Sequence, residues 1–158
     1  RVLASVDLET AGPSWQDAMR IRARSLRQAL ARHPWAVGQL ESNRALGPAT
    51  LRYCDSVLGV LRRGGFSPLM AGRAFWVLDS YIYGCAIQQQ RFASSKPADV
   101  QVENEAFLEK LPGEAYPNLA EVAGHFVATE VDLDRDFDRG LDLLLEALEA
   151  WRGEGREN

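Results

Sequence analysis

Apolar residues recur at intervals of three and four along most of the 158-residue chain, the spacing that places them on one face of a helix. No stretch alternates apolar and polar residues as a half-buried strand does. Capping residues, glycines and prolines divide the pattern into segments. We therefore predict an all-α fold, a multi-helix orthogonal or antiparallel bundle, with helices over about residues 14–33, 35–41, 48–63, 68–91, 103–111, 117–129 and 133–151. Residues 94–103 are expected to form a mobile loop.

The clearest boundary between two helices is the segment Gly64–Pro68. Gly64 and Gly65 can take the left-handed conformation that closes a helix, because they have no Cβ. Ser67 can cap the next helix, and Pro68 suits its first position. The helix that follows is apolar on most sides, so we expect it to be the central helix of the domain.

The last predicted helix has the most regular apolar pattern. Its apolar residues follow one another at intervals of 4, 3, 4 and 3, an a/d heptad pattern formed by Phe137, Leu141, Leu144, Leu148 and Trp151. Leu143 and Leu145 flank this seam, so more than one face needs covering. Two interpretations stay open: either one face binds a partner, or both faces are covered within the monomer.

Composition and charge narrow the class of protein. A hydrophobic content of 46% and a charged content of 25% are typical of one soluble globular domain. The net charge of −4 argues against a nucleic-acid-binding surface within this chain. The arginines of the first helix are interpreted as a solvated face. Cys54 and Cys85 lack metal-type spacing and are expected to be reduced core residues. With no apolar run of membrane-spanning length and no signal peptide, a cytoplasmic protein is expected.

Motifs that would support catalysis or metal binding are missing from the sequence. It has only two histidines, neither beside a cysteine in sequence, and it has no phosphate-binding loop, nucleophile elbow or zinc spacing. The acidic run 132–138 has Phe137 where a calcium loop needs glycine, and Leu143 where it needs glutamate. Its carboxylates are better explained by the positive end of a helix dipole. We expect no catalytic residue, metal site or cofactor.

Polar residues on the long apolar helix are the candidates for function. Asp79 and Gln88 lie among aromatic side chains. A buried carboxylate without a partner is costly, so Asp79 needs a cation, and Arg22 is one candidate. The pair is interpreted either as a structural salt bridge or as the polar part of an apolar cavity that binds a small molecule.

Five ordered segments resemble one protein family. They are Ser14–Asp17, Leu26–His33, Gly65–Ser67, Gly84–Cys85 and Phe137–Leu145. In order and spacing, they are similar to the regulatory domain of tetracycline-repressor (TetR/AcrR) regulators over about residues 1–152.

The resemblance implies the effector-binding and dimerisation domain of a bacterial transcriptional repressor, in which a small, largely apolar inducer releases operator DNA. It also implies a homodimer built on a four-helix bundle, and DNA contact only through a helix-turn-helix domain absent from this chain. Residues 1–12 would end the helix that connects to that domain, residues 13–152 would form the regulatory domain, and residues 153–158 a frayed tail. The alternatives are a dimerisation module without a ligand and a small helical enzyme.

The resemblance also assigns site residues. It implies ligand contacts at Arg22, Leu26, Leu46, Cys54, Val57, Phe75, Asp79 and Gln88, to which we add Trp35 and Trp76 as aromatic walls. It implies a dimer interface formed by Ile82, Ala86, Phe137, Leu141, Leu144, Leu148 and Trp151. The two residues with which the tetracycline repressor holds a drug-bound magnesium correspond to Glu41 and Gln88. Glutamine is a poor replacement for a charged magnesium ligand, so sensing of a metal–tetracycline complex is not expected.

Overall fold

The computed structural model describes residues 6, 14–36, 47–93, 97–129 and 132–154. Within these ranges it contains helices and no strand, which confirms the all-α prediction. The helices are α1 (Trp15–Arg32), α3 (Pro48–Arg63), α4 (Pro68–Ala93), α5 (Pro97–Lys110), α6 (Pro117–Ala128) and α7 (Leu133–Glu154). None of the helices in these ranges is long and apolar enough to cross a membrane.

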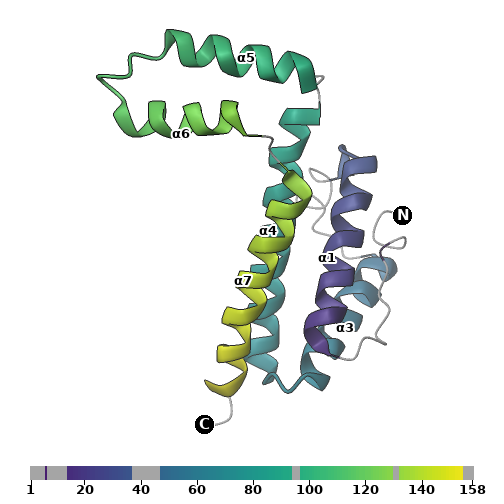
Figure 1. Cartoon of the computed structure of the whole chain (residues 1–158). Helices are drawn as coiled ribbons and strands as arrows, with labels where there is room; N and C mark the ends of the chain where they lie inside the picture. Colours follow the sequence, from purple (N-terminus) through teal and green to yellow (C-terminus); the bar gives the residue numbers. More distant parts are fainter. Residues whose placement is uncertain (1–5, 7–13, 37–46, 94–96, 130–131, 155–158) are drawn as a thin grey trace.

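Helix α4 is the centre of the domain, as its apolar sequence predicts. Helices α1, α3 and α7 all pack against it (Figure 1). Their inward faces form a core of fully buried side chains that includes Leu26, Leu61, Ala74, Leu78 and Leu141. Helices α5 and α6 pack mainly on each other and project from one end of α4 as a hairpin (Figure 1). The domain is therefore a helical bundle from which the α5–α6 hairpin projects.

Local capping explains where the main helices begin and end. The Ser14 hydroxyl accepts a hydrogen bond from the Asp17 backbone N–H at 3.1 Å and so caps α1. The Ser67 hydroxyl accepts one from the Met70 N–H at 3.3 Å and caps α4. Between α3 and α4, Gly65 has a φ of 98°, which favours glycine. A Cβ on Gly64 would lie 2.8 Å from the Trp15 Cβ, so the turn packs closely against α1.

Two predicted boundaries are wrong. Helix α5 begins at Pro97, so most of the predicted loop 94–103 is helical. The missing N–H of proline costs nothing in the first turn, and Pro97 therefore starts a helix here rather than breaking one. Helix α7 continues to Glu154, beyond the predicted end at Trp151. The short helix predicted at 35–41 and the connecting segment at 1–12 lie almost wholly outside the described residues.

The predicted dimer seam on α7 needs correction, because much of it is buried within the chain itself. Phe137, Leu141 and Leu148 are at most 3% exposed, and the Phe137 ring stacks on Tyr81 of α4 with centroids 5.3 Å apart. Leu144 and Trp151 are half-buried against the same core. On α4, Ile82 and Ala86 are likewise buried. These faces already pack on α1 or α4, so the fully buried members have no surface to offer a partner.

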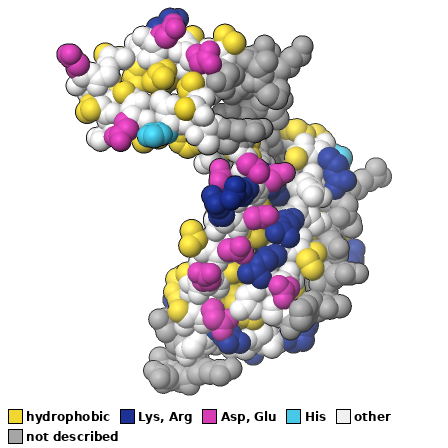
Figure 2. Space-filling model, in the orientation of Figure 1, with side chains coloured by type: hydrophobic (Ala, Val, Ile, Leu, Met, Phe, Trp, Pro, Cys, Tyr) yellow, Lys and Arg dark blue, Asp and Glu magenta, His cyan; other side chains and the backbone are white. Residues whose placement is uncertain are grey.

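The arginines of α1 also differ from the prediction of a solvated face. Arg22 is buried, and three others form ion pairs with aspartates of α7, in antiparallel order. The N···O distances are 2.8 Å for Arg20–Asp142, 2.9 Å for Arg24–Asp138 and 2.5 Å for Arg27–Asp134. Figure 2 shows this face as basic and acidic side chains gathered side by side. We call these three pairs the α1–α7 ladder.

Candidate functional site

An ion pair between a buried arginine and a mostly buried aspartate joins α1 to α4. The Arg22 side chain is 1% exposed, and its Nη2 donates a hydrogen bond to Asp79 Oδ1. The Arg22 Nε donates to the Tyr53 hydroxyl of α3 at 2.8 Å. The prediction that Arg22 is the partner of Asp79 is confirmed. We call Arg22, Asp79, Tyr53 and the adjoining Phe75 the Arg22 cluster.

Helix geometry explains why these residues meet. Residues four apart in a helix lie on the same face, one turn above the other. Each of the three helices has such a pair of residues facing the cluster. The pairs are Arg22 and Leu26 on α1, Tyr53 and Val57 on α3, and Phe75 and Asp79 on α4. Leu26 and Val57 are buried, so the cluster continues directly into the apolar core.

Aromatic rings stabilise the buried charge from two sides. The Arg22 guanidinium carbon lies 5.2 Å from the Tyr53 ring centroid and 5.4 Å from that of Phe75. Both distances fall within the range at which a cation is attracted to a ring face. The guanidinium is therefore held by one carboxylate, one hydroxyl and two rings.

Burial controls the ionisation of the cluster. Burial raises the pKa of the Asp79 carboxyl, although the charge and the hydrogen bond of Arg22 oppose this. It also raises the pKa of the Tyr53 hydroxyl. The pKa of the neighbouring Cys54 thiol is raised by burial and then by the charge of Asp79. For Arg22, burial acts to lower the pKa, but interactions with Tyr53 and Asp79 outweigh it and raise the pKa. The ion pair of Arg22 and Asp79 thus lies beside a hydroxyl and a thiol whose pKa values burial raises.

The predicted ligand residues divide into two groups in space. Arg22, Phe75 and Asp79 meet in the cluster, with the buried Leu26 and Val57 on the same helix faces and the half-buried Cys54 next to Tyr53. The side chains of the second group, Trp35, Trp76 and Gln88, are exposed. Trp76 is 72% exposed because one residue after Phe75 is about 100° around the helix. Leu46 and Glu41 lie outside the described residues.

Tyr53 is the cluster residue that sequence reasoning missed. The buried residues of α3 are Tyr53, Val57, Val60 and Leu61, while Leu51 is exposed. The sequence did contain a signal for burial of Tyr53. Tyr53, Val57, Val60 and Leu61 follow one another at helical spacing and therefore lie on one helix face.

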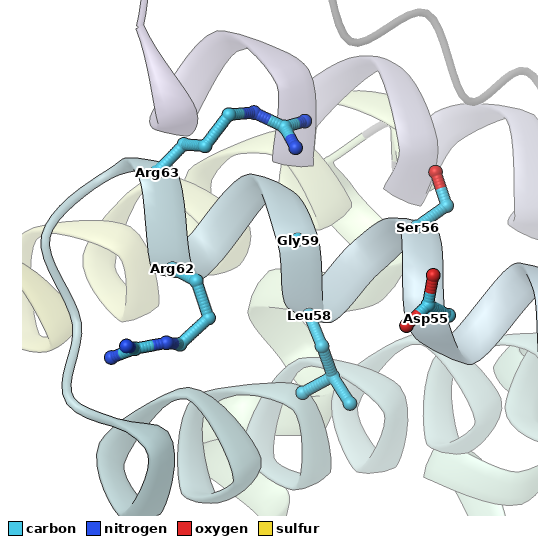
Figure 3. A pocket seen from close by; sticks show the side chains of 6 residues that line it. All are labelled: Asp55, Ser56, Leu58, Gly59, Arg62 and Arg63. Atoms are coloured by element: carbon cyan, nitrogen blue, oxygen red, sulfur yellow. The ribbon is translucent and has the colours of Figure 1, made fainter.

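The outer surface of α3 carries a separate depression of about 500 Å³. Its walls are Asp55, Ser56, Leu58, Gly59, Arg62 and Arg63, all from α3 (Figure 3). Figure 3 shows Arg62 and Arg63 extending in different directions from the end of the helix. Arg62 already donates a hydrogen bond to the Phe66 carbonyl oxygen. A wide, charged hollow on one helix offers little to an apolar molecule, so the Arg22 cluster is the better candidate.

Comparison with known proteins places the chain in a family. Residues 9–152 match the family described as tetracyclin repressor-like, C-terminal domain. An HTH-type transcriptional regulator of Saccharopolyspora erythraea is 28% identical over 142 residues, which are 90% of this chain and 58% of the relative. The HTH-type transcriptional repressor DrrR1 of Streptomyces coeruleorubidus is 27% identical, over 85% of this chain and 52% of the relative. The chain thus spans little more than half the length of these curated relatives.

A solved structure agrees with this placement. The TetR family protein ActR of Streptomyces coelicolor, in complex with actinorhodin, aligns with a TM-score of 0.78 and 25% identity, over 96% of this chain and 72% of ActR. The helical bundle described above therefore has the fold of the matching 72% of ActR. On the match over residues 9–152, the chain belongs to the TetR family of transcriptional regulators and carries its C-terminal, tetracycline repressor-like domain.

Proposed function

We propose that the chain is the effector-binding and dimerisation domain of a bacterial TetR-family repressor acting in the cytoplasm, and that a small, largely apolar inducer binds at the Arg22 cluster. One observation carries this proposal: a charge-balanced polar group lies buried among aromatic and aliphatic side chains. Ligand sites commonly combine apolar walls with a few placed polar groups. The complexes of ActR with actinorhodin and with (S)-DNPA support an effector role for this kind of domain. No catalytic role is proposed.

Ligand entry requires the helices around the cluster to separate. Arg22 is 1% exposed, so a molecule that contacts it selects an arrangement in which α1, α3 and α4 are further apart. Helices α1 and α4 also hold α7, through the α1–α7 ladder and through the contact of Tyr81 with Phe137. A shift at the cluster therefore reaches α7. Coupling between effector and operator would follow from the different affinities of the ligand for the two arrangements.

The proposed dimer uses the outer faces of α4 and α7, in place of the buried seam. Three exposed apolar residues of α4 are Leu69, Trp76 and Ile87. They are seven and eleven residues apart, so they lie on one face of the helix. Leu143 of α7 is 68% exposed and points away from its own core. A second copy of the chain would cover these residues by packing α4 and α7 against their counterparts, forming a four-helix bundle. The half-buried Leu144 and Trp151 stay in the proposed interface.

The α5–α6 hairpin extends the apolar surface that the proposed dimer would cover. Its large exposed apolar side chains are Val102, Phe107, Tyr116, Leu119, Val122 and Phe126, and α6 has no buried residue. Because so much of its apolar surface is exposed, the hairpin is expected to pack on another surface. We propose that it packs on the second copy of the chain.

A screen of small molecules by thermal shift, followed by titration calorimetry, tests the effector role. A verified binder should change at least about tenfold in affinity for the Asp79→Asn variant, because Asp79 both balances the charge of Arg22 and holds α1 to α4. An unchanged affinity would show that the binder sits elsewhere. The alternative, a dimerisation module without a ligand, is favoured by the enclosure of Arg22. It would be supported if a broad library gave no binder while dimerisation persisted.

A further inference from the structure

One nitrogen of the buried Arg22 guanidinium has no hydrogen-bond partner among the described residues. The Nε and Nη2 atoms donate to Tyr53 and Asp79, but Nη1 donates to no protein group there. Guanidinium groups have five N–H donors in one plane. An unsatisfied buried donor is costly and uncommon in native structures, and one on a charged group is more costly still.

The surroundings of Nη1 restrict what can satisfy it. The rings of Tyr53 and Phe75 attract the charge through their faces, but they supply no strong acceptor. The Tyr53 hydroxyl is already occupied by Nε. A partner must therefore be an acceptor atom from outside the cluster. The faces of both rings already cover the guanidinium, so a flat, apolar body behind that atom would meet these rings edge to face, a geometry that aromatic pairs favour.

The charge balance of the cluster selects among acceptors. Asp79 already neutralises Arg22. A ligand carboxylate would add a second negative charge to a buried site that has one positive charge, and that charge would lose its hydration without a counter-ion. An uncharged carbonyl oxygen satisfies Nη1 without this cost. In agreement with this, burial raises the pKa of the Asp79 carboxyl.

We infer that Arg22 Nη1 anchors an uncharged carbonyl oxygen of a flat, largely apolar ligand that enters beside Tyr53 and Phe75. This inference rests on the proposed effector-binding function and names the ligand chemistry of that same site. It assigns separate roles to the three guanidinium nitrogens. Nε and Nη2 connect α1 to α3 and α4, and Nη1 donates a hydrogen bond to the ligand.

Three probes that share one ring system test the inference by titration calorimetry on the purified chain: fluorene, 9-fluorenone and fluorene-9-carboxylate. Fluorenone has a carbonyl group where fluorene has a methylene group. We expect fluorenone to bind at least about tenfold tighter than fluorene, the scale of one hydrogen bond to a charged donor. The carboxylate should bind no tighter than fluorene. Equal affinities for fluorenone and fluorene would overturn the inference while leaving an apolar pocket in place.

The variant Arg22→Lys assigns the effect to Nη1. Lysine keeps the positive charge that faces Asp79 but lacks the second guanidinium arm. The fluorenone preference should fall to within about twofold in this variant and persist in the control Arg24→Lys, an exposed change on the same helix. A preference that survives Arg22→Lys would overturn the assignment.

A spectroscopic readout on the unaltered chain makes the test independent of how the variant folds. The infrared carbonyl band of bound fluorenone should lie at lower wavenumber than in cyclohexane, because a hydrogen bond weakens the C=O bond. An unshifted band would contradict the anchor. If none of the three probes bound, the inference would fail, while the effector role itself would still be decided by the broad thermal-shift screen.

Discussion

The hydroxyl of Tyr81 occupies the space that a side chain at Gly140 would need. A Cβ placed on Gly140 would lie 2.2 Å from the Tyr81 hydroxyl oxygen. The same hydroxyl donates a hydrogen bond to the Phe137 carbonyl oxygen at 2.9 Å. The tyrosine side chain thus lies across one turn of α7. It fits there because residue 140 is a glycine and has no Cβ. This contact fixes the register of α7 against α4.

The substitution Gly140→Ala tests the close contact. We expect a loss of about 1–3 kcal/mol in the free energy of unfolding, because overpacking outweighs the better helix propensity of alanine. Urea denaturation measures this loss. The matched control is Gly153→Ala on the same helix, where a Cβ meets nothing within 4 Å, so stability should not fall. Equal effects of the two substitutions would contradict the proposed register contact.

The proposed dimer predicts that a charge at Leu143 separates the two copies. Leu143→Glu should shift the chain from dimer to monomer in sedimentation velocity at micromolar concentration, because a carboxylate buried in an apolar interface is costly. Leu51→Glu on α3 is the control, since Leu51 is also exposed but lies outside the proposed interface. A wild-type monomer with α7 intact, or a dimer that tolerates Leu143→Glu, would argue against this interface.

The raised pKa of Asp79 predicts a pH dependence opposite to that of most carboxylates. Because the folded pKa is above the unfolded value, the Asp79 contribution to stability is complete below the unfolded pKa and is lost as pH rises through the folded pKa. The free energy of unfolding of the wild type minus that of Asp79→Asn should therefore decrease as pH rises from below the unfolded pKa of aspartate, about 3.9, through the folded pKa. Chemical denaturation of both proteins at several pH values measures it. An increase over that range would show that the Arg22 charge outweighs burial.

The α1–α7 ladder should contribute modestly and depend on salt. A double-mutant cycle on Arg24 and Asp138 should give a coupling of about 0.2–1 kcal/mol at low salt, because both side chains are more than a third exposed. This coupling should shrink in about 1 M sodium chloride, where the Debye length is about 3 Å. A coupling that salt leaves unchanged would mean that the pair acts through packing rather than through charge.

Much of the fold could be predicted because local signals agreed with tertiary packing. Ser14 and Ser67 are capping residues in sequence and in space, and the Gly64–Pro68 turn lies where the glycines indicate it. The start of α5 was missed because Pro97 can begin a helix or end one, and sequence context alone does not separate the two cases. Helix existence was thus easier to predict than helix boundaries.

The candidate site was only partly predictable. Arg22 and Asp79 stand out as charges on apolar faces, and their pairing followed from the cost of a lone buried carboxylate. Trp76 was assigned to the site because it is aromatic and close in sequence, yet rotation along α4 places it on the outside. Likewise, the α7 pattern showed which residues need cover. It did not show whether that cover is α4 of the same chain or a partner.

A crystal structure of the chain with a binder found by thermal shift tests the central claim most directly. We expect the binder to lie between α1, α3 and α4, in contact with Arg22 and against Tyr53 or Phe75. These helices should be further apart than in the unbound chain. A binder in the depression on α3 lined by Asp55 and Arg63, with the Arg22 cluster still closed, would contradict it.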